Sequence, residues 1–279
     1  MMRYLIMYDS LSCLNCSACM SACSMENRMR MERDSGVDIS RAVNEFQYAS
    51  YYLRPERVEV GEYPESRLLV GFHHCHHCEN APCLNNCPAE AIERRKAGQV
   101  VINEAACIGC RTCRDACPFD VPFYDPQSGT SKKCIGCYDR TESGLQPACV
   151  TACMTQALIS GPEDAVIEEG ERRIAQYTER LGGEYIFYGK DEVNSTVGRL
   201  GWVTIAPKAD APYYLLPDNP YKAGMRVRSA AKVAGAVGVA GVLAGAALHG
   251  LHLLGARKDR VKAAEEKTEE GSDEERSRD

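Results

Sequence analysis

The stretch CIGCRTCRDACPF, residues 107–119, places four cysteines within eleven positions and follows the last of them with proline. Three further groups of four cysteines have a similar format, at residues 13–23, 75–87 and 134–153, so that the groups together contain all sixteen cysteines of the 279-residue chain. Since no thiol lies outside these groups, one kind of chemistry should account for all of them. The candidates are disulfides, zinc sites and iron–sulfur clusters.

The spacing of the cysteines favours iron–sulfur clusters. A disulfide between cysteines three apart would be strained, and zinc sites usually combine two separated CxxC pairs. In the CxxCxxCxxxCP run of two-cluster ferredoxins, three thiolates bind one cubane and the fourth binds the other cluster. Residues 13–23 and 107–117 have this cysteine spacing, whereas one gap widens to four residues in 75–87 and to eleven in 134–153. We therefore expect four [4Fe–4S] clusters.

The crossing of the fourth cysteine requires the groups to work in pairs. We expect the second group to pair with the third, and the first group with the fourth. Each site is named here after the cysteine that crosses over to it. The expected ligands are Cys75, Cys78, Cys83 and Cys117 in the Cys117 site; Cys107, Cys110, Cys113 and Cys87 in the Cys87 site; Cys13, Cys16, Cys19 and Cys153 in the Cys153 site; and Cys134, Cys137, Cys149 and Cys23 in the Cys23 site.

The rest of the chain predicts an α+β fold. Residues 75–153 contain few uninterrupted apolar runs. This part should therefore consist of loops and short elements that the clusters hold together. Apolar residues recur at helical spacing over Pro162–Leu181, at Val166, Ile167, Ile174, Tyr177 and Leu181. Strands are expected at VEV (58–60), RLLVGF (67–72), EYIFYG (184–189) and GWVTIAP (201–207), and an extended tether at residues 206–222.

A single transmembrane helix is expected near the C-terminus. Val233–Leu254 contains 22 residues without a charge, about 33 Å as a helix, which covers a hydrocarbon core of about 30 Å. Its Gly and Ala content keeps a buried soluble helix open as an alternative. Small residues at every fourth position suit packing against a membrane partner. His249 and His252 share one face of this helix, where they would hydrogen-bond that partner or contact a haem propionate or quinone.

These segments give four expected domains. They are a double ferredoxin-like domain binding four clusters at 1–160, a helix, strands and tether at 161–228, the transmembrane helix at 229–256 and a charged, disordered tail at 257–279.

Charge and the N-terminal sequence exclude some functions. The net charge is −6 and no basic stripe with interleaved aromatics stands out, so nucleic acid is not expected as a partner. The start of the chain, MMRYLIMYDSLSC, reaches its first cysteine too soon for a cleavable signal peptide, and we expect any export to depend on a partner.

Residues beside the cysteines allow a structural and a functional interpretation. His73, His74, His76 and His77 surround two cysteines, and we expect packing or hydrogen bonding to sulfur rather than haem or Rieske-type ligation, because cysteine already supplies four ligands to each cluster. The pair Lys132-Lys133 precedes Cys134; a solvated face is the expected role, and tuning of a cluster potential is the alternative.

The motifs CLNCSACMSAC, CHHCENAPCLNNCPAEAI, CIGCRTCRDACPF and KCIGCYDRTESGLQPACVTACMTQALISG resemble the four-cluster iron–sulfur subunit of the complex iron–sulfur molybdoenzymes, and the resemblance runs from about Leu11 to Gly161. The C-terminal helix makes the chain most similar to the beta subunit of the membrane formate dehydrogenase. Met154 and Ser24 stand where the family often has another residue, commonly proline in the fourth group. All sixteen ligand positions are cysteine, so no three-iron cluster is expected.

The resemblance implies a non-catalytic subunit that relays electrons between two partners. One is a catalytic subunit with a molybdenum or tungsten bis-pterin site, whose twin-arginine signal would carry the folded module across the membrane. The other is a membrane cytochrome b or quinone-reactive subunit. Five Lys and Arg after the helix against four before or at its start favour a single-pass protein with a cytoplasmic tail and the ferredoxin domain outside.

Three alternatives remain open from the sequence. The same role in a hydrogenase or in a sulfur-compound or nitrogen-oxide reductase would change the catalytic partner. A freestanding polyferredoxin carrier would form no stable complex. A zinc-binding interaction module would contain no iron.

Overall fold

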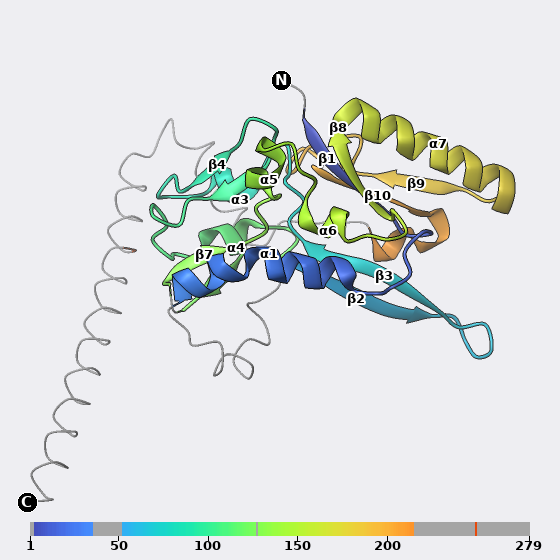
Figure 1. Ribbon diagram of the computed structural model, residues 1–279, viewed down its shortest axis with the longest axis horizontal. Helices are drawn as coiled ribbons and strands as arrows, with labels where there is room; N and C mark the ends of the chain where they lie inside the picture. Colours follow the sequence, from blue (N-terminus) through green and yellow to red (C-terminus); the bar gives the residue numbers. More distant parts are fainter. Residues whose placement is uncertain (1–2, 36–51, 127, 215–248, 250–279) are drawn as a thin grey trace, which may run out of the picture. The chain divides into compact units, whose positions relative to one another are not determined.

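A four-stranded sheet of order β8-β1-β10-β9 forms around the apolar N-terminal strand. The computed structural model describes residues 3–35, 52–126, 128–214 and 249 (Figure 1). Strand β1 (Tyr4–Asp9) pairs in parallel with β10 (Trp202–Pro207) and antiparallel with β8 (Leu158–Pro162), and β10 pairs antiparallel with β9 (Tyr185–Tyr188).

Successive side chains of β1 enter two different cores, because neighbouring residues of a strand point to opposite faces of the sheet. Leu5 and Met7 are packed with Val166 of helix α7 (Glu163–Leu181). Ile6 and Tyr8 are packed instead with Trp202 and with cysteines of the first and fourth groups. The sheet therefore separates a conventional apolar core from the cysteine-rich part of the chain.

The cysteine-rich part consists of short elements, as the sequence predicts. It contains the hairpins β4 (Ile92–Arg94) with β5 (Val100–Ile102) and β6 (Phe123–Asp125) with β7 (Thr130–Lys132). Its helices are α1 (Ala18–Ser35), α3 (Pro82–Asn85), α4 (Thr112–Ala116), α5 (Tyr138–Glu142) and α6 (Ala148–Thr151). A longer hairpin of β2 (Leu53–Val60) and β3 (Arg67–His74) extends away from this part (Figure 1).

The predicted strands and the predicted long helix are confirmed. The strands correspond to parts of β2, β3, β9 and β10, and the helix Pro162–Leu181 corresponds to α7, which ends before Gly182 at a φ of 69°. One detail of the helix differs from the prediction. Leu181 is 67% exposed, because it lies in the last turn beyond the end of the contact with the sheet.

Two boundaries differ from the expected ones. The expected domain boundary at residue 160 falls inside β8, and Met1–Lys222 form one compact unit in which the sheet combines residues from both sides of that point. The expected tether at 206–222 is not extended beyond the end of β10 at Pro207. Lys208–Tyr213 form a 3-10 helix, η1, in which the buried Asp210 pairs with Arg67.

The described residues include no helix that is both long and apolar enough to span a bilayer. The predicted membrane segment Val233–Leu254 lies outside the described residues, apart from His249. The charged tail and His252 also lie outside them.

Candidate iron–sulfur sites

Each cysteine group combines a loop with a helix, which is α1 in the first group and a short helix in the other three. In the third group, Cys107 and Cys110 lie in the loop, Cys113 lies in α4 and Cys117 directly follows that helix. The third and fourth cysteines of every group are four residues apart, a spacing of about 6 Å along a helix axis. Such a step allows one group to contribute ligands to two neighbouring centres.

Left-handed backbone conformations turn the loops around the sulfur atoms. Within the loops, Asn15, Gly109, Arg111 and Gly136 have φ values of 56°, 68°, 61° and 64°. The amide of Gly136 donates to the Sγ atom of Cys134 at 3.3 Å, and the amide of Asn15 approaches Cys13 Sγ at 3.5 Å. Consecutive amides that point into a concave turn are a common way to hold an anionic iron–sulfur centre.

A hairpin brings the second and third groups together. The β4–β5 hairpin pairs Ile92, five residues after Cys87, with Ile102, five residues before Cys107. The helices that follow the two loops, α3 and α4, contact each other. The pairing of these two groups therefore follows from a local turn in the chain.

Strand pairing brings the first and fourth groups together. Tyr8 of β1 lies opposite Leu158 of β8, and the amide of Asp9 donates to the carbonyl oxygen of Ala157 at 2.8 Å. The first group begins four residues after Asp9, and the fourth ends four residues before Ala157. Helices α1 and α6, which carry cysteines of these groups, also contact each other.

The four cysteines of the Cys117 site interact electrostatically. Burial raises the pKa of the Cys78 thiol well above its usual value, and the neighbouring Cys75, Cys117 and Cys83 raise it further. Burial likewise raises the pKa of Cys83 to about 12 and that of Cys117 to about 11. At Cys75, burial also opposes the thiolate, but His77 and Lys133 outweigh it and lower the pKa to about 5.

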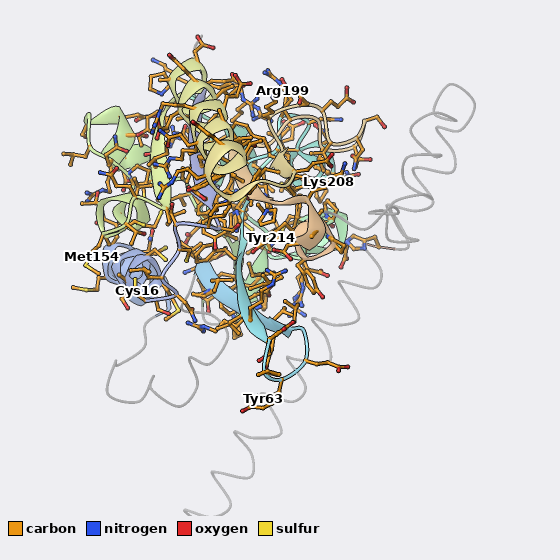
Figure 2. The ribbon with its side chains drawn as sticks, turned by 90° about the vertical axis from the view of Figure 1, so that its right-hand side faces the viewer. Cys16, Tyr63, Met154, Arg199, Lys208 and Tyr214 are labelled. Carbon is orange, nitrogen blue, oxygen red and sulfur yellow. The ribbon has the colours of Figure 1, made fainter. Side chains whose placement is uncertain are left out.

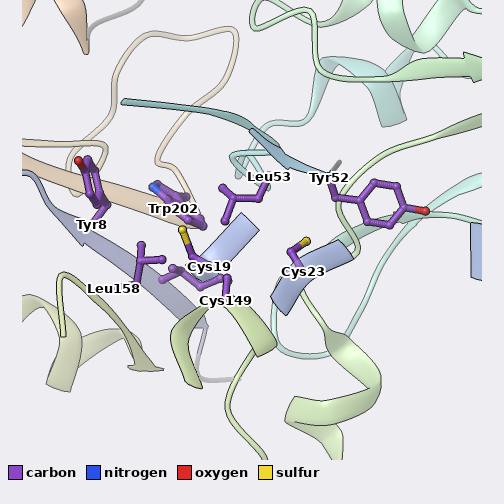
Figure 3. Packing of buried hydrophobic residues seen from close by; sticks show 9 residues of the cluster. Tyr8, Cys19, Cys23, Tyr52, Leu53, Cys149, Leu158 and Trp202 are labelled. Carbon is purple, nitrogen blue, oxygen red and sulfur yellow. The ribbon is translucent and has the colours of Figure 1, made fainter. Parts of the chain in front are cut away.

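Cysteines of the Cys153 and Cys23 sites also interact electrostatically with one another. Burial raises the pKa of Cys19 to about 11, and among its neighbours Cys13, Cys153 and Cys16 raise it further. Burial raises the pKa of Cys149 well above its usual value, with further contributions from Cys23, Cys137 and Cys134. Figure 3 shows Cys19 and Cys149 gathered with Leu158 and Trp202 in the core beside the sheet.

For the Cys87 site, the evidence is the electrostatic interaction of three cysteines and the packing of Cys87. Burial raises the pKa of Cys113, and Cys107 and Cys110 are among the neighbours that raise it further. Cys87 is packed against the buried cluster that contains Cys113, Val100 and Leu200. The same cluster contains Cys78 and Cys83, so the assignment of Cys87 to this site stays a prediction.

The donor set fits cubane clusters. All sixteen cysteines are free thiols in the structure. Among the described residues, no three Cys, His, Asp or Glu side chains converge at the spacing that a single metal ion needs. A [4Fe–4S] cubane places each of its four thiolates on a different iron, so its ligands stand apart around the corners. Hydrogen bonds to sulfur, such as that from the Leu158 amide to Cys153 Sγ at 3.3 Å, are the usual second layer of such sites.

The histidines of HHCHHC pack as the sequence predicts. The His74 ring lies 3.9 Å from that of Trp202, and the His76 ring lies 3.9 Å from that of Phe119, measured between centroids. His77 accepts a hydrogen bond at Nδ1 from the amide of Val100 at 3.0 Å. His73 lines a cavity of about 310 Å³ together with residues of β2, β3 and η1.

The prediction that Lys132 and Lys133 form a solvated face is wrong. Lys132 is 2% exposed and Lys133 is 4% exposed. Burial alone would lower the pKa of Lys133, but Cys75, Cys83 and Cys134 outweigh it and raise that pKa. Lys132 lies in strand β7, directly before the loop of the fourth cysteine group.

The Cys153 site lies nearest the surface. Cys16 is exposed, and beside the other ligands Met154 is 79% exposed and Leu14 is 68% exposed. Figure 2 shows Cys16 and Met154 at one edge of the molecule. The Cys117 site, by contrast, draws on three buried cysteines, Cys75, Cys78 and Cys83.

Comparisons with known proteins point to one kind of protein. A family model described as a 4Fe-4S dicluster domain matches residues 68–163. The thiosulfate reductase electron transfer subunit of Salmonella typhi is 32% identical over 203 residues, covering 69% of this chain and 94% of that subunit. The formate dehydrogenase-O iron-sulfur subunit of Escherichia coli is 32% identical over 216 residues, covering 76% of this chain and 70% of that subunit. The B subunit of the anaerobic dimethyl sulfoxide reductase of Haemophilus influenzae is 34% identical over 165 residues, covering 59% of this chain and 76% of the relative.

Proposed function

Because this protein belongs to the iron–sulfur electron-transfer subunits of the complex iron–sulfur molybdoenzymes, we propose that it relays electrons through four [4Fe–4S] clusters between a catalytic subunit and a membrane subunit. The relatives are electron-transfer subunits of reductase and dehydrogenase complexes and are not their catalytic subunits. The chain is accordingly an iron–sulfur electron-transfer subunit, and the number of clusters and the identity of the partners are the proposed part.

Electrostatic interactions among the cysteines of the expected sites support this proposal. Each bound cluster would accept and release one electron without changing its ligands. The chain's own residues would hold the clusters through the sixteen cysteines, orient them through the loops and short helices, and exclude water from the Cys117 site, three of whose cysteines are buried. With all ligand positions occupied by thiolate, no open coordination position remains for a substrate.

The proposed partners are a molybdenum or tungsten bis-pterin subunit of the formate dehydrogenase type and a membrane cytochrome b or quinone-reactive subunit. The match to the formate dehydrogenase-O iron-sulfur subunit, over 76% of this chain, supports this assignment. The chain would be held at the membrane by the predicted helix at 229–256, with the cysteine-rich domain outside.

A second candidate is a subunit of a sulfur-compound reductase. The match to the thiosulfate reductase electron transfer subunit covers 94% of that protein, a larger share than is covered in the formate dehydrogenase relative. The two candidates share the conduit and differ in the catalytic subunit, so the catalytic subunit must decide between them.

The deciding experiment is purification of the full chain from membranes in mild detergent, with identification of the co-purifying chains. We expect a large pterin-containing subunit and a membrane subunit, with about sixteen irons bound to this chain after anaerobic handling. Formate or thiosulfate turnover by the intact complex would identify the catalytic partner. A chain that purifies alone with its clusters would be a freestanding carrier, and a colourless chain containing zinc would refute the conduit.

A further inference from the structure

Lys133 is a buried cation that contacts cysteine sulfur. Its Nζ atom donates to Cys75 Sγ at 3.5 Å and to the carbonyl oxygen of Cys134 at 3.3 Å, and it also donates to the carbonyl oxygen of Val100. Cys75 belongs to the Cys117 site and Cys134 to the Cys23 site. The ammonium group therefore lies between two neighbouring sites, with its sulfur contact on the Cys117 side.

The adjacent Lys132 has a different environment. Its Nζ atom lies 3.1 Å from a carboxylate oxygen of Asp125 and 3.8 Å from one of Glu104. Two carboxylates offset the charge of this buried lysine locally, as is usual for a charge in a protein interior. Around Lys133, the largest influences besides burial are the thiols of Cys75, Cys83 and Cys134.

Lys133 is the cationic donor among the described hydrogen bonds to cysteine sulfur. The others come from backbone amides, such as Ser131 N to Cys107 Sγ at 3.4 Å, or from neutral side chains, such as Asn27 Nδ2 to Cys23 Sγ at 3.6 Å. His77 also lies beside Cys75, and its Nδ1 atom accepts a hydrogen bond from the Val100 amide. Lys133 thus brings a positive charge into direct contact with a sulfur atom of the Cys117 site.

We propose that Lys133 raises the reduction potential of the cluster in the Cys117 site. Reduction adds one electron, and therefore one negative charge, to a centre that already carries four thiolates. A buried cation in contact with one of those thiolates stabilises the reduced cluster more than the oxidised one, because the interaction grows with the added charge and little water screens it. This inference rests on the proposed function, since it requires a cluster in that site.

The test is an EPR-monitored redox titration of the intact, cluster-loaded protein with Lys133→Met, Lys133→Gln and Lys133→Arg. The signal of the Cys117 site is identified as the one that Cys117→Ser alters. At the ambient potential where wild-type protein has this cluster half reduced, we expect both neutral variants to lower its reduced-to-oxidised ratio at least tenfold, a shift of about 59 mV for one electron. Lys133→Arg should retain most of the wild-type ratio.

Lys132→Met is the matched control, since it removes a neighbouring buried charge that carboxylates already offset. We expect it to change the ratio less than threefold, and the Cys153 and Cys87 signals should not move in any of these variants. An unchanged Cys117-site signal in a fully loaded Lys133→Met protein would overturn the inference and leave the conduit intact. Loss of that cluster in both neutral variants, with full loading of Lys133→Arg, would assign Lys133 to cluster assembly and would also overturn it. Wild-type protein without iron would instead refute the proposed function.

Discussion

Replacing Arg173 with methionine should destabilise the segment that leads from β1 into the first cysteine group. The carboxylate of Asp9, at the end of β1, is fully buried. It accepts hydrogen bonds from Arg173 Nη1 at 3.0 Å, from the Tyr177 hydroxyl at 2.7 Å and from the Ser12 hydroxyl at 2.9 Å. The amide of Leu11 also donates to it, at 3.1 Å. Arg173, whose side chain is 11% exposed, supplies the opposing charge.

The size of the effect follows from the buried charge that the substitution leaves behind. Removing one partner of a buried ion pair costs about 3–5 kcal/mol. Since three neutral donors still bind Asp9, we expect the lower end, about 3 kcal/mol. In a folded unit of this size, 1 kcal/mol changes the melting temperature by about 2–4 °C, so the expected decrease is about 6–12 °C.

Thermal unfolding followed by far-UV circular dichroism, at one fixed scan rate on cluster-loaded protein, measures this decrease. Arg172→Met is the control, because that side chain is 53% exposed and pairs with Glu169 at the surface, so we expect a much smaller decrease. Adding Asp9→Asn to Arg173→Met should recover part of the loss, since the buried charge then disappears. Equal melting temperatures for Arg173→Met and Arg172→Met would refute the reasoning.

Two further predictions concern the cysteine-rich part. Gly109→Ala should lower the unfolding free energy by about 2–5 kcal/mol and reduce bound iron, because φ is 68° and the new Cβ would lie 2.2 Å from the carbonyl oxygen of Gly129. Gly129→Ala, also at a φ of 68° but with no described atom within 4 Å, should cost about 1–2 kcal/mol; equal iron loss in both variants would contradict the steric argument. Removal of iron by an anaerobic chelator should abolish hydrogen-exchange protection at residues 75–117 and spare β1 and α7, whose shared core contains no cysteine; uniform loss of protection by mass spectrometry would disprove this division.

The sequence predicts the elements that have a strong local signal. Alternating or periodic apolar residues give β10 and α7, and the scarcity of apolar runs gives the loops and short elements of residues 75–153. The 3-10 helix η1 lacks such a signal. It forms where an extended tether was expected, and the buried Asp210 within it pairs with Arg67, a partner 143 residues away.

Burial of charged residues is the part that the sequence predicts least well. Two adjacent lysines have the composition of a solvated pair, yet Lys132 and Lys133 both lie in the interior. The carboxylates that offset Lys132 come from the hairpin partner strand and from residue 104, and the thiolates beside Lys133 include one from residue 75. A single sequence shows none of these distant partners.

The pairing of the first cysteine group with the fourth depends on the sheet rather than on the cysteines. Pairing of β4 with β5 joins the second and third groups across a short turn. These two groups form the inner module, whose parts lie close together in the sequence. The first and fourth groups are more than a hundred residues apart, and the antiparallel register of Tyr8 with Leu158 places their ends together. The second and third groups thus lie between the first and fourth groups in the sequence. The first and fourth groups form the outer module, in which Cys13 follows β1 and Cys153 precedes β8. A change that slips β1 against β8 should therefore disturb the Cys153 site before it disturbs the Cys87 site, although both are built from the same cysteine format.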